Sequence, residues 1–459
     1  MVDLFLFSQP YMYYNRKIAL HTLGCKLNFS ETSAIARILT EQGYQKVDFS
    51  DRADYYIINT CSVTENADKE TKQIVKNALK TNPHAKVIIV GCYAQLKPEE
   101  IVKITGVSLV LGANEKFKIH EYLEQLEEQS KPLIVSGDIN EVNFYTDAYS
   151  QGERTRSFVK VQDGCDYNCA FCTIPLARGK SRSSSIANTL KTIHKVATTG
   201  VKEIVLTGVN LGDFGKTETG NERTCEDFFQ LIQSLEEVEK VERFRISSIE
   251  PNLLTQDIIQ WVANSQKFMP HFHIPLQSGS DKILKLMRRK YLRNLYQDKV
   301  EMIKSAMPHA CIGVDIIVGF PGETEELFLE TYNFINQLDL SYLHVFTYSE
   351  RANTRALNIT PIVPVAERKE RNKMLRILSE KKKRKFYAEH INTTRPVLFE
   401  AENDNGIRYG FTDNYIKVGI PFEQEMWNTI ERIALNQVSD FGYVKGSRVD
   451  EFVNVQIIQ

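Results

Sequence analysis

Residues 164–172 read Gly-Cys-Asp-Tyr-Asn-Cys-Ala-Phe-Cys, and the rest of the chain is built around them. The cysteines are Cys165, Cys169 and Cys172, in the spacing C-x3-C-x2-C. Thiolates this close suit a [4Fe–4S] cluster, in which three cysteines leave one of the four irons without a protein ligand. Such an open position can hold a small molecule. The alternatives are three unrelated thiols or a zinc site, which normally needs a fourth Cys or His; the next histidine is His194.

This spacing is similar to that of the radical S-adenosylmethionine (SAM) enzymes. The resemblance implies that the open iron binds the amino and carboxylate groups of SAM. It also implies that the reduced cluster cleaves SAM to a 5′-deoxyadenosyl radical.

Extended and helical segments alternate around this stretch. Six apolar segments predict strands: Arg156–Val161, Glu203–Thr207, Arg243–Ser247, His271–Leu276, Gly313–Val318 and Tyr342–Thr347. Segments between them predict helices, among them Ile186–Thr199, Cys225–Leu235, Asp281–Met287 and Glu325–Gln337. Six strand–helix units indicate a partial (β/α)6 barrel of the TIM type, whose functional residues lie at the carboxyl ends of the strands.

Polar residues and glycines follow the predicted strands at those ends. We expect eight residues to contact SAM: Phe171, Thr207, Gly208, Asn210, Ser247, Glu250, Gln277 and Val318. Glycine permits close backbone approach, and carboxylate or amide side chains bind hydroxyl or amino groups. The alternative is that these are ordinary turn residues of barrel loops.

Arg178 and Arg182 follow the cysteine stretch closely. Beside a predicted active site, they are expected to position a phosphate backbone, with a solvated helix entry as the alternative. Cys225 and Cys311 lack cluster spacing. We expect Cys225 to start a helix and Cys311 to lie in the core, so both are left out of the site.

The preceding residues, from Lys17 to about Gly137, predict parallel βαβ units. The expected strands are Lys17–Leu23, Tyr55–Asn59, Lys86–Val90 and Ser108–Leu111, and the expected helices are Ser30–Glu41, Asn66–Leu79 and Pro98–Ile104. Ser30 is the expected N-cap of the first helix, and Gly43 its carboxyl-terminal stop.

Three cysteines follow the first three of these strands. They are Cys25, Cys61 and Cys92, and Gly24 and Gly91 precede two of them. Because the carboxyl ends of parallel strands share one sheet edge, these thiols are expected to converge. The sequence therefore predicts a second iron–sulfur cluster with an open iron. Three buried free cysteines are the alternative.

The tail predicts a basic helix followed by a small β-barrel. The helix, Arg368–Tyr387, carries Lys381, Lys382 and Arg384, which we expect to contact RNA; a merely solvated face is the alternative. Five strands are expected at Pro396–Ala401, Arg408–Phe411, Tyr415–Val418, Thr429–Asn436 and Gly446–Gln459, a size seen in RNA-binding modules.

Composition narrows the class of protein further. The net charge of −1 excludes a global field that attracts nucleic acid, so any basic patch is local. No apolar run approaches the ~18 residues of a membrane span. Met1–Tyr14 lacks the pattern of a signal peptide, and eight cysteines without one indicate metal binding in a reducing cytoplasm.

Nearly all of this α/β chain from Lys17 onward is similar to the methylthiotransferase family, whose last domain is of the TRAM type. The resemblance rests on TLGCKLN (22–28), NTC (59–61), GC (91–92), FVKVQDGC (158–165) and HIPLQSGS (273–280). It implies an N-terminal domain at 17–137 that binds an auxiliary cluster, a radical SAM domain at 154–390 and a TRAM-like barrel at 394–459.

This family has three main branches, which act on isopentenyladenosine in tRNA, on threonylcarbamoyladenosine in tRNA, or on an aspartate of a ribosomal protein. TLGCKLN followed by Glu31 and Thr32 resembles the second branch; the first more often reads YGCQMN there. The resemblance implies transfer of a methylthio group to C2 of N6-threonylcarbamoyladenosine at position 37 of tRNA. The other two substrates remain alternatives.

The resemblance further implies two [4Fe–4S] clusters and two SAM molecules. The N-terminal cluster carries sulfur that one SAM methylates, and the radical from the second SAM takes hydrogen from C2. An unactivated aromatic C–H needs cofactor chemistry of this kind. The expected partners are the anticodon loop of tRNA and an external electron donor. The sulfur source is not indicated, and we expect a cytoplasmic monomer.

A non-catalytic iron–sulfur protein, either an electron carrier or a redox-sensing RNA binder, is the alternative outside the enzymes. Carriers usually ligate each cluster with four cysteines, whereas both sites predicted here have three.

Overall fold

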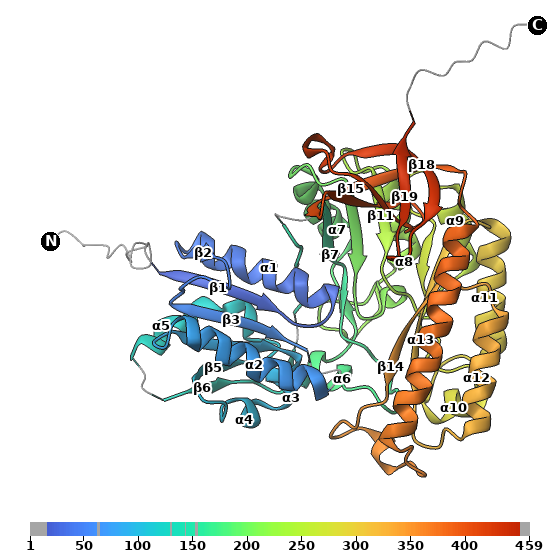
Figure 1. Cartoon of the computed structure of the whole chain (residues 1–459). Helices are drawn as coiled ribbons and strands as arrows, with labels where there is room; N and C mark the ends of the chain where they lie inside the picture. The colour runs from blue at the N-terminus through green and yellow to red at the C-terminus, as the bar shows by residue number, and fades with distance from the viewer. Residues whose placement is uncertain (1–15, 62–64, 129–130, 143, 152–154, 450–459) are drawn as a thin grey trace, which may run out of the picture.

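The computed structural model describes residues 16–61, 65–128, 131–142, 144–151 and 155–449. Figure 1 shows an N-terminal sheet domain, a central domain and a small C-terminal barrel. The α/β class and this order of folds confirm the expectation. The expectation for Met1–Tyr14, and most of the last predicted strand, lie outside the described residues.

The N-terminal domain is built on a six-stranded, wholly parallel sheet. Its spatial order is β2 (Gln45–Val47), β1 (Lys17–Thr22), β3 (Tyr55–Thr60), β4 (Lys86–Gly91), β5 (Val107–Leu111) and β6 (Leu133–Val135). The helices are α1 (Lys26–Glu41), α2 (Glu65–Thr81), α3 (Cys92–Leu96), α4 (Pro98–Ile101) and α5 (Ile119–Glu128). Two apolar clusters, one on each face, bury the central strands, as parallel sheets require.

Helix α1 begins earlier than the sequence suggested. Cys25 is its N-cap, so the prediction of Ser30 as N-cap is wrong. Ser30 lies inside the helix, where its hydroxyl donates to the carbonyl oxygen of Leu27. Gly43 follows the helix with φ +93°, the left-handed conformation that a stop glycine provides.

The central domain contains the six predicted parallel strands. They form two three-stranded sheets, β7 (Arg156–Lys160), β10 (Glu203–Thr207) and β11 (Arg243–Ile246), and β12 (His271–His273), β13 (Cys311–Val318) and β14 (Tyr342–Thr347). The halves adjoin where Ile249 N–H donates to the carbonyl oxygen of His273, at 3.1 Å. Two short strands, β8 (Gln162–Asp163) and β9 (Arg182–Ser183), pair beside them.

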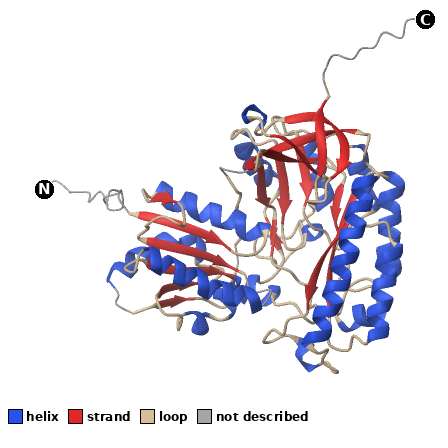
Figure 2. Cartoon of the chain, viewed as in Figure 1, coloured by secondary structure: helices blue, strands red, loops and turns tan. Residues whose placement is uncertain are grey.

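Helices cover the outer side of these strands, as Figure 2 shows. They are α7 (Ile186–Ala197), α8 (Phe228–Glu236), α9 (Gln256–Asn264), α10 (Asp281–Leu286), α11 (Arg293–Ala306), α12 (Glu325–Gln337) and α13 (Val365–Ala388). The short helix α6 (Ile174–Arg178) lies instead beside α3 of the N-terminal domain. The core lies between the strands and this layer. Cys311 is buried as expected, whereas α8 begins at Phe228 and leaves Cys225 exposed before it.

The C-terminal domain is a closed barrel of five strands. Around the barrel they run β15 (Thr394–Asp404), β16 (Ile407–Thr412), β17 (Lys417–Pro421), β19 (Val444–Arg448) and β18 (Ile430–Val438). The barrel covers the amino ends of the central strands, because Arg243 donates to the carbonyl oxygens of Phe411 and Pro396, and Arg156 pairs with Glu400. In the described part of the chain, every helix is too short or too polar to cross a membrane.

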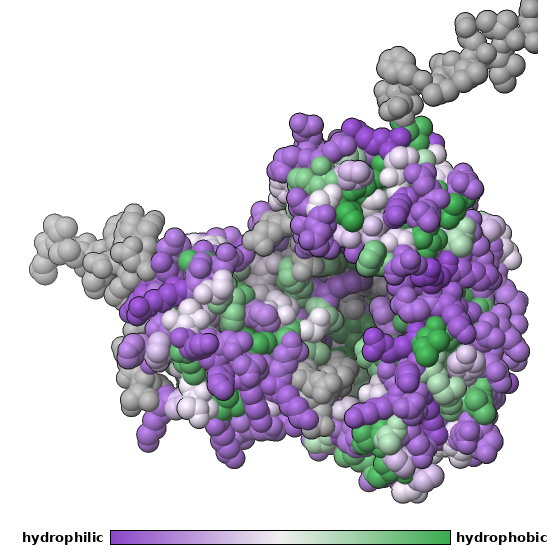
Figure 3. Space-filling model, in the orientation of Figure 1, coloured by the Kyte–Doolittle hydropathy of each residue, from purple (hydrophilic) through white to green (hydrophobic). Residues whose placement is uncertain are grey.

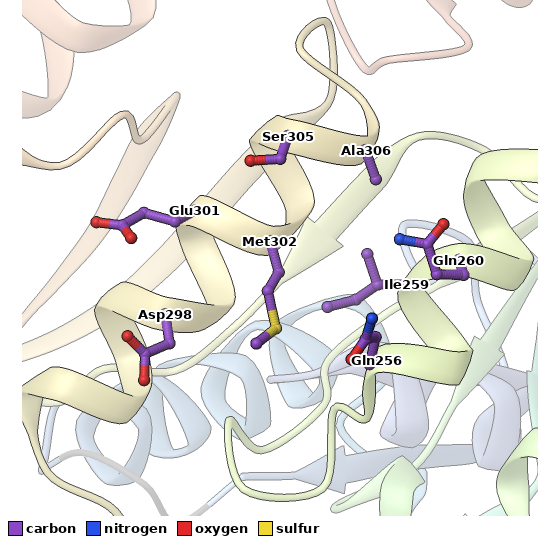
Figure 4. Close-up of a pocket in the computed structure, with 8 residues that line it drawn as sticks. All are labelled: Gln256, Ile259, Gln260, Asp298, Glu301, Met302, Ser305 and Ala306. Carbon is purple, nitrogen blue, oxygen red and sulfur yellow. The ribbon is translucent and has the colours of Figure 1, made fainter.

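A surface hollow lies between α9 and α11 (Figure 4). Its lining is Gln256, Ile259, Gln260, Asp298, Glu301, Met302, Ser305 and Ala306. Two carboxylates at this hollow would repel an RNA backbone, and its lining includes none of the cysteines. This hollow therefore lies apart from both groups of cysteines.

Candidate active site

The three N-terminal cysteines follow three neighbouring strands of the sheet. Cys25 follows β1, Cys61 follows β3 directly, and Cys92 opens α3 directly after β4. In Figure 1 these strands run with their carboxyl ends toward the central domain. Cys61 and Cys92 are 9% and 6% exposed, whereas Cys25 is open to solvent.

Two glycines leave the space that this arrangement needs. Gly24 has φ +97°, and a Cβ atom there would lie 2.6 Å from Cys61 Cβ and 3.0 Å from Cys61 Sγ. Gly91 also has φ +97°, and a Cβ atom there would lie 2.4 Å from Asn59 Oδ1. The side chain of Cys61 thus fills the space left by Gly24. An all-thiolate donor set at a glycine-lined sheet edge fits an iron–sulfur cluster.

The second cysteine group lies in the loop between β8 and α6. Backbone N–H groups of Tyr167 and Ile174 donate to the sulfurs of Cys165 and Cys172, each at 3.4 Å. Burial, followed by mutual repulsion with other thiols, raises the pKa of Cys165 and Cys172 to about 12. Such thiols lose their protons when a cation replaces them, so this loop suits cluster iron rather than a free nucleophile.

Arg289 joins this loop to the end of β11. Its NH1 group donates to Cys169 Sγ at 3.1 Å, and its NH2 group pairs with Glu250. A second hydrogen bond also holds this loop: Asn252 Nδ2 donates to the hydroxyl oxygen of Tyr167 at 2.7 Å. The predicted SAM residue Glu250 is therefore connected to the cysteine loop through one guanidinium group.

Asn210 is the predicted SAM residue whose surroundings best suit a ligand. It is 2% exposed, and neither its amide nitrogen nor its amide oxygen has a hydrogen-bond partner among the described residues. Buried polar atoms normally have partners, so this amide has capacity for a bound molecule. Gln162 Oε1 accepts from the backbone N–H groups of Val209 and Asn210, which fixes the loop beside the cysteines.

The other predicted SAM residues have three kinds of surroundings. Val318 packs its side chain into the core, so a contact of this residue with SAM is left to its backbone. Gln277 has φ +66°, a strained conformation typical of functional positions. The rest lie at strand ends or in the cysteine loop: Phe171, Thr207, Gly208 and Ser247.

A buried ionic cluster, here called the domain joint, connects the two cysteine regions. It consists of Glu31, Lys116, Lys160, Asp163, Arg178 and Arg182. Arg178, at the end of α6, donates to both oxygens of Glu31 at 2.9 and 3.0 Å and to Asp163 at 3.0 Å. It also donates to Asn28 Oδ1 at 2.6 Å. Asn28 in turn donates to the carbonyl oxygen of Thr60, next to Cys61.

The joint corrects the expected role of the two arginines. Arg178 and Arg182 are 3% and 5% exposed. Arg182 donates to Asp163 at 3.2 Å and to the carbonyl oxygens of Phe144 and Arg178. Because these guanidinium groups are committed inside the protein, they cannot hold an RNA backbone. Arg178 instead fixes the N-terminal domain to the cysteine loop, and Arg182 holds Asp163 and the backbone of Arg178 in place.

The inner face of the central strands and the cysteine edge of the N-terminal sheet enclose a space that we call the lumen. Figure 3 shows a deep hollow between these two domains. Side chains on this inner face remain open to solvent, including His344 and Phe346 of β14, as does Lys26 of α1. Enclosure by the walls nevertheless lowers the pKa of Lys26 to about 8.

Comparisons with known proteins agree with this geometry. Residues 17–112 match the model of an uncharacterized protein family, UPF0004, and residues 159–335 match the radical SAM superfamily. The threonylcarbamoyladenosine tRNA methylthiotransferase MtaB of Bacillus subtilis is 38% identical, over 91% of this chain and 93% of its own length. The chain belongs to the radical SAM methylthiotransferase family.

Other members of the methylthiotransferase family are similar at lower or equal identity. The Aquifex aeolicus protein of the same name is 38% identical, over 88% of this chain and 96% of its own length. A tRNA-2-methylthio-N(6)-dimethylallyladenosine synthase of Lachnoclostridium phytofermentans is 31% identical, over 93% and 94%. The solved radical SAM methyltransferase TsrM of Kitasatospora setae shares the fold, with a TM-score of 0.54, 13% identity and coverage of 72% and 73%.

On α13 of this methylthiotransferase, the predicted RNA residues differ in their surroundings. Lys381 and Arg384 are exposed, and Arg384 has only a 3.4 Å contact with the exposed Asp440. Lys382 instead donates to the carbonyl oxygens of Asn336 and Leu338, at the carboxyl end of α12. Burial, and then Lys385, lower the pKa of Lys382 to about 8. Its ammonium group therefore caps a helix rather than facing solvent.

Sequence reasoning gave no role to several residues that position the site. Arg289 and Gln162 act through contacts between segments that are distant in the sequence, and no local sequence pattern predicts such contacts. Glu31 and Asn28 had a readable signal, because they lie six and three residues beyond Cys25 on α1. Asn28 lies three residues beyond Cys25 and Glu31 three residues beyond Asn28, so each successive pair of side chains is adjacent on the helix surface.

Proposed function

We propose that this methylthiotransferase adds a methylthio group to C2 of N6-threonylcarbamoyladenosine at position 37 of tRNA. The observation that carries the proposal is the placement of two separate cysteine triads around one lumen. Cys25, Cys61 and Cys92 lie at the edge of the N-terminal sheet, and Cys165, Cys169 and Cys172 lie in the loop before α6. The joint between them brings a sulfur-carrying centre and a radical-generating centre to the same substrate carbon.

Each triad is proposed to hold a [4Fe–4S] cluster with one open iron. When bound, these groups supply sulfur at the N-terminal triad and a 5′-deoxyadenosyl radical from SAM at the loop triad. The chain itself orients them: Arg289 donates to Cys169, backbone N–H groups donate to Cys165 and Cys172, and the unpartnered amide of Asn210 offers hydrogen bonds to SAM. An external reductant is required.

The anticodon loop is the proposed RNA partner, because its bases can be splayed out into a pocket. Exposed cations on α13 and the C-terminal barrel are the proposed contacts to the RNA backbone. Assignment to the threonylcarbamoyl substrate is supported by the 38% identical relatives that carry this name. A dimethylallyl substrate is the second candidate, supported by the relatives at 31% identity.

The test uses anaerobically reconstituted protein with reductant, SAM and tRNA that carries threonylcarbamoyladenosine. The RNA is digested and its nucleosides are analysed by mass spectrometry. We expect a nucleoside heavier by one methylthio group. Formation of 5′-deoxyadenosine without this product would contradict the substrate, and absence of both with intact clusters would contradict the reaction. A parallel reaction with dimethylallyl tRNA tests the second candidate.

A further inference from the structure

Three polar side chains lie side by side on the inner face of the last three central strands. They are His273 of β12, Asp315 of β13 and His344 of β14. Asp315 Oδ1 is 2.9 Å from His273 Nε2 and 3.3 Å from His344 Nδ1. Their neighbours along the strands, such as Phe272 and Val314, are buried in the outer core. The alternation of a strand therefore directs these three residues into the lumen.

This wall of the lumen is open to a ligand. The side chains of His344 and Asp315 are 54% and 25% exposed, and Phe346, two residues beyond His344 on the same face, is 43% exposed. Asp315 Oδ2 makes no hydrogen bond with the described residues. Here donors, an acceptor and an aromatic face remain available.

Lys26 brings a cation to this wall. It is the first residue of α1, directly after Cys25, and its ammonium group is close enough to feel the charges of Arg156, Arg245, Glu203 and Asp315. Both carboxylates already have cationic or imidazole partners, since Arg245 holds Glu203 at 3.0 Å. Lys26 itself has no hydrogen bond or ion pair in the described part of the chain. Its ammonium group can therefore form an ion pair with a carboxylate of a ligand.

The chemistry of the proposed substrate matches these groups. The threonylcarbamoyl substituent ends in a carboxylate and a hydroxyl group, whereas a dimethylallyl substituent is wholly apolar. In adenine, C2 and C6 are both bonded to N1, so a substituent on N6 lies on the same edge of the base as C2. When C2 faces the cluster on Cys25, this substituent is directed to the same side of the lumen, where Lys26 follows Cys25 in the chain.

We propose that Lys26 and the His273–Asp315–His344 cluster form the subsite for the threonyl part of the substrate. Lys26 pairs with the carboxylate, and the cluster binds the hydroxyl and ureido groups. This inference rests on the proposed function and adds the residues that select the substituent. A dimethylallyl group in the same place would leave these polar groups unpaired and desolvated, so the subsite favours the charged substrate.

The test measures binding rather than turnover. Full-length protein with both clusters, without reductant, is titrated with tRNA that carries threonylcarbamoyladenosine and with the same RNA after its carboxylate is converted to a neutral amide. We expect wild type to bind the acid about tenfold more tightly, the effect of one good charged hydrogen bond. Lys26→Gln should bind both RNAs with the affinity that wild type has for the amide.

Three further variants make the outcome decisive. Lys26→Arg keeps the charge and should keep the preference, and Lys46→Gln, on exposed β2, is the matched control that should keep it too. His344→Ala, remote in sequence from the cluster ligands, should lose the preference for threonylcarbamoyl over glycylcarbamoyl adenosine, which lacks the hydroxyl. All variants must carry the iron content of wild type.

Two results would overturn the subsite: no preference for the acid in wild type, or an undiminished preference in Lys26→Gln. Product formation separates these failures from failure of the proposed function. If reduced wild type methylthiolates the threonylcarbamoyl tRNA but Lys26→Gln still discriminates, only the subsite is wrong. If wild type gives no methylthio product on this RNA, the proposed function is wrong.

Discussion

Glu31 lies where the N-terminal and central domains meet, and its carboxylate is shared by several cations. Arg178 and Lys116 pair with it at 2.9 and 2.8 Å, and Lys160 lies at 3.7 Å. Glu31→Gln would leave these buried cations without their common partner. Because an uncompensated buried charge is costly, we expect a loss of ~3–5 kcal/mol in the free energy of unfolding. Urea unfolding of both proteins under anaerobic conditions measures it.

Glu41→Gln, at the exposed end of the same helix, is the matched control. Its free energy of unfolding should change by no more than about 0.5 kcal/mol. Equal effects of the two substitutions would contradict the role of the domain joint.

The same carboxylate predicts a dependence of stability on pH. Burial alone would raise the pKa of Glu31, but Arg178, Lys116 and Lys160 lower it from 4.5 to about 2. Because the folded-state pKa is the lower one, the carboxylate stabilises fully above about pH 4.5 and loses this effect as the pH falls to about 2. The stability difference between wild type and Glu31→Gln should shrink over that range. A stability difference that stays constant between pH 4.5 and 2 would contradict the lowered pKa of Glu31.

Gly24 tests the cluster site in the N-terminal domain. A methyl group there would lie 2.6 Å from Cys61 Cβ, on a backbone with φ +97°. Gly24→Ala should therefore displace Cys61, and iron content should fall from ~8 to ~4 per chain as one of two four-iron clusters is lost. Gly200→Ala is the matched control, since Gly200 has φ +79° and open space around its Cα. Equal iron loss in both variants would indicate backbone strain alone.

At the scale of elements, α13 presents neighbouring cations with different surroundings. Lys381 and Arg384 face solvent, whereas Lys382 donates to Leu338 at 2.7 Å. Lys381→Ala and Arg384→Ala should weaken tRNA binding and each reduce the slope of log K against log salt by ~1. Lys382→Ala should leave that slope unchanged and lower the melting temperature, because α12 loses its cap. The reverse pattern would place Lys382 on the RNA.

The elements also show what the sequence could predict. The buried parallel strand β10 agrees with its predicted bounds because its apolar run is continuous, and the half-exposed strand β14 also agrees with its predicted bounds. The three-residue strands β2 and β6 were not predicted, since three residues are too few to show the alternation of apolar and polar side chains that marks a strand. Convergence of Cys25, Cys61 and Cys92 at one sheet edge could be predicted, because topology alone places them there.

The remaining site residues depend on contacts between distant segments. Arg178 was expected on RNA because its sequence surroundings are basic, but its partner Glu31 lies 147 residues away. Similarly, Arg289 reaches Cys169 across 120 residues. A local pattern gives the residue type and the element, whereas the partner comes only from the packing of domains.

At the scale of the whole molecule, the C-terminal barrel supports the central strands. Arg243 and Arg245 donate to its carbonyl oxygens at Pro396 and Asp413, at 2.9 and 3.1 Å. Removal of residues 394–459 would expose these buried guanidinium groups and the amino ends of the strands. We expect the truncated protein to melt at a lower temperature and to lose cluster content, beyond any loss of RNA affinity. A truncated protein with both clusters and an unchanged melting temperature would contradict this.

The domain joint limits which hybrid proteins can fold, where a hybrid combines domains of two family members. The residues of the joint come from two different stretches of the gene. Glu31 and Lys116 belong to one stretch, and Asp163 and Arg178 to the other. An N-terminal domain transplanted from another member of the family would assemble on this chain only if it brought a carboxylate at the place of Glu31. The two stretches therefore behave as a single heritable unit. Recombination between them would give a folded protein only where the charged residues on the two sides of the domain joint are complementary.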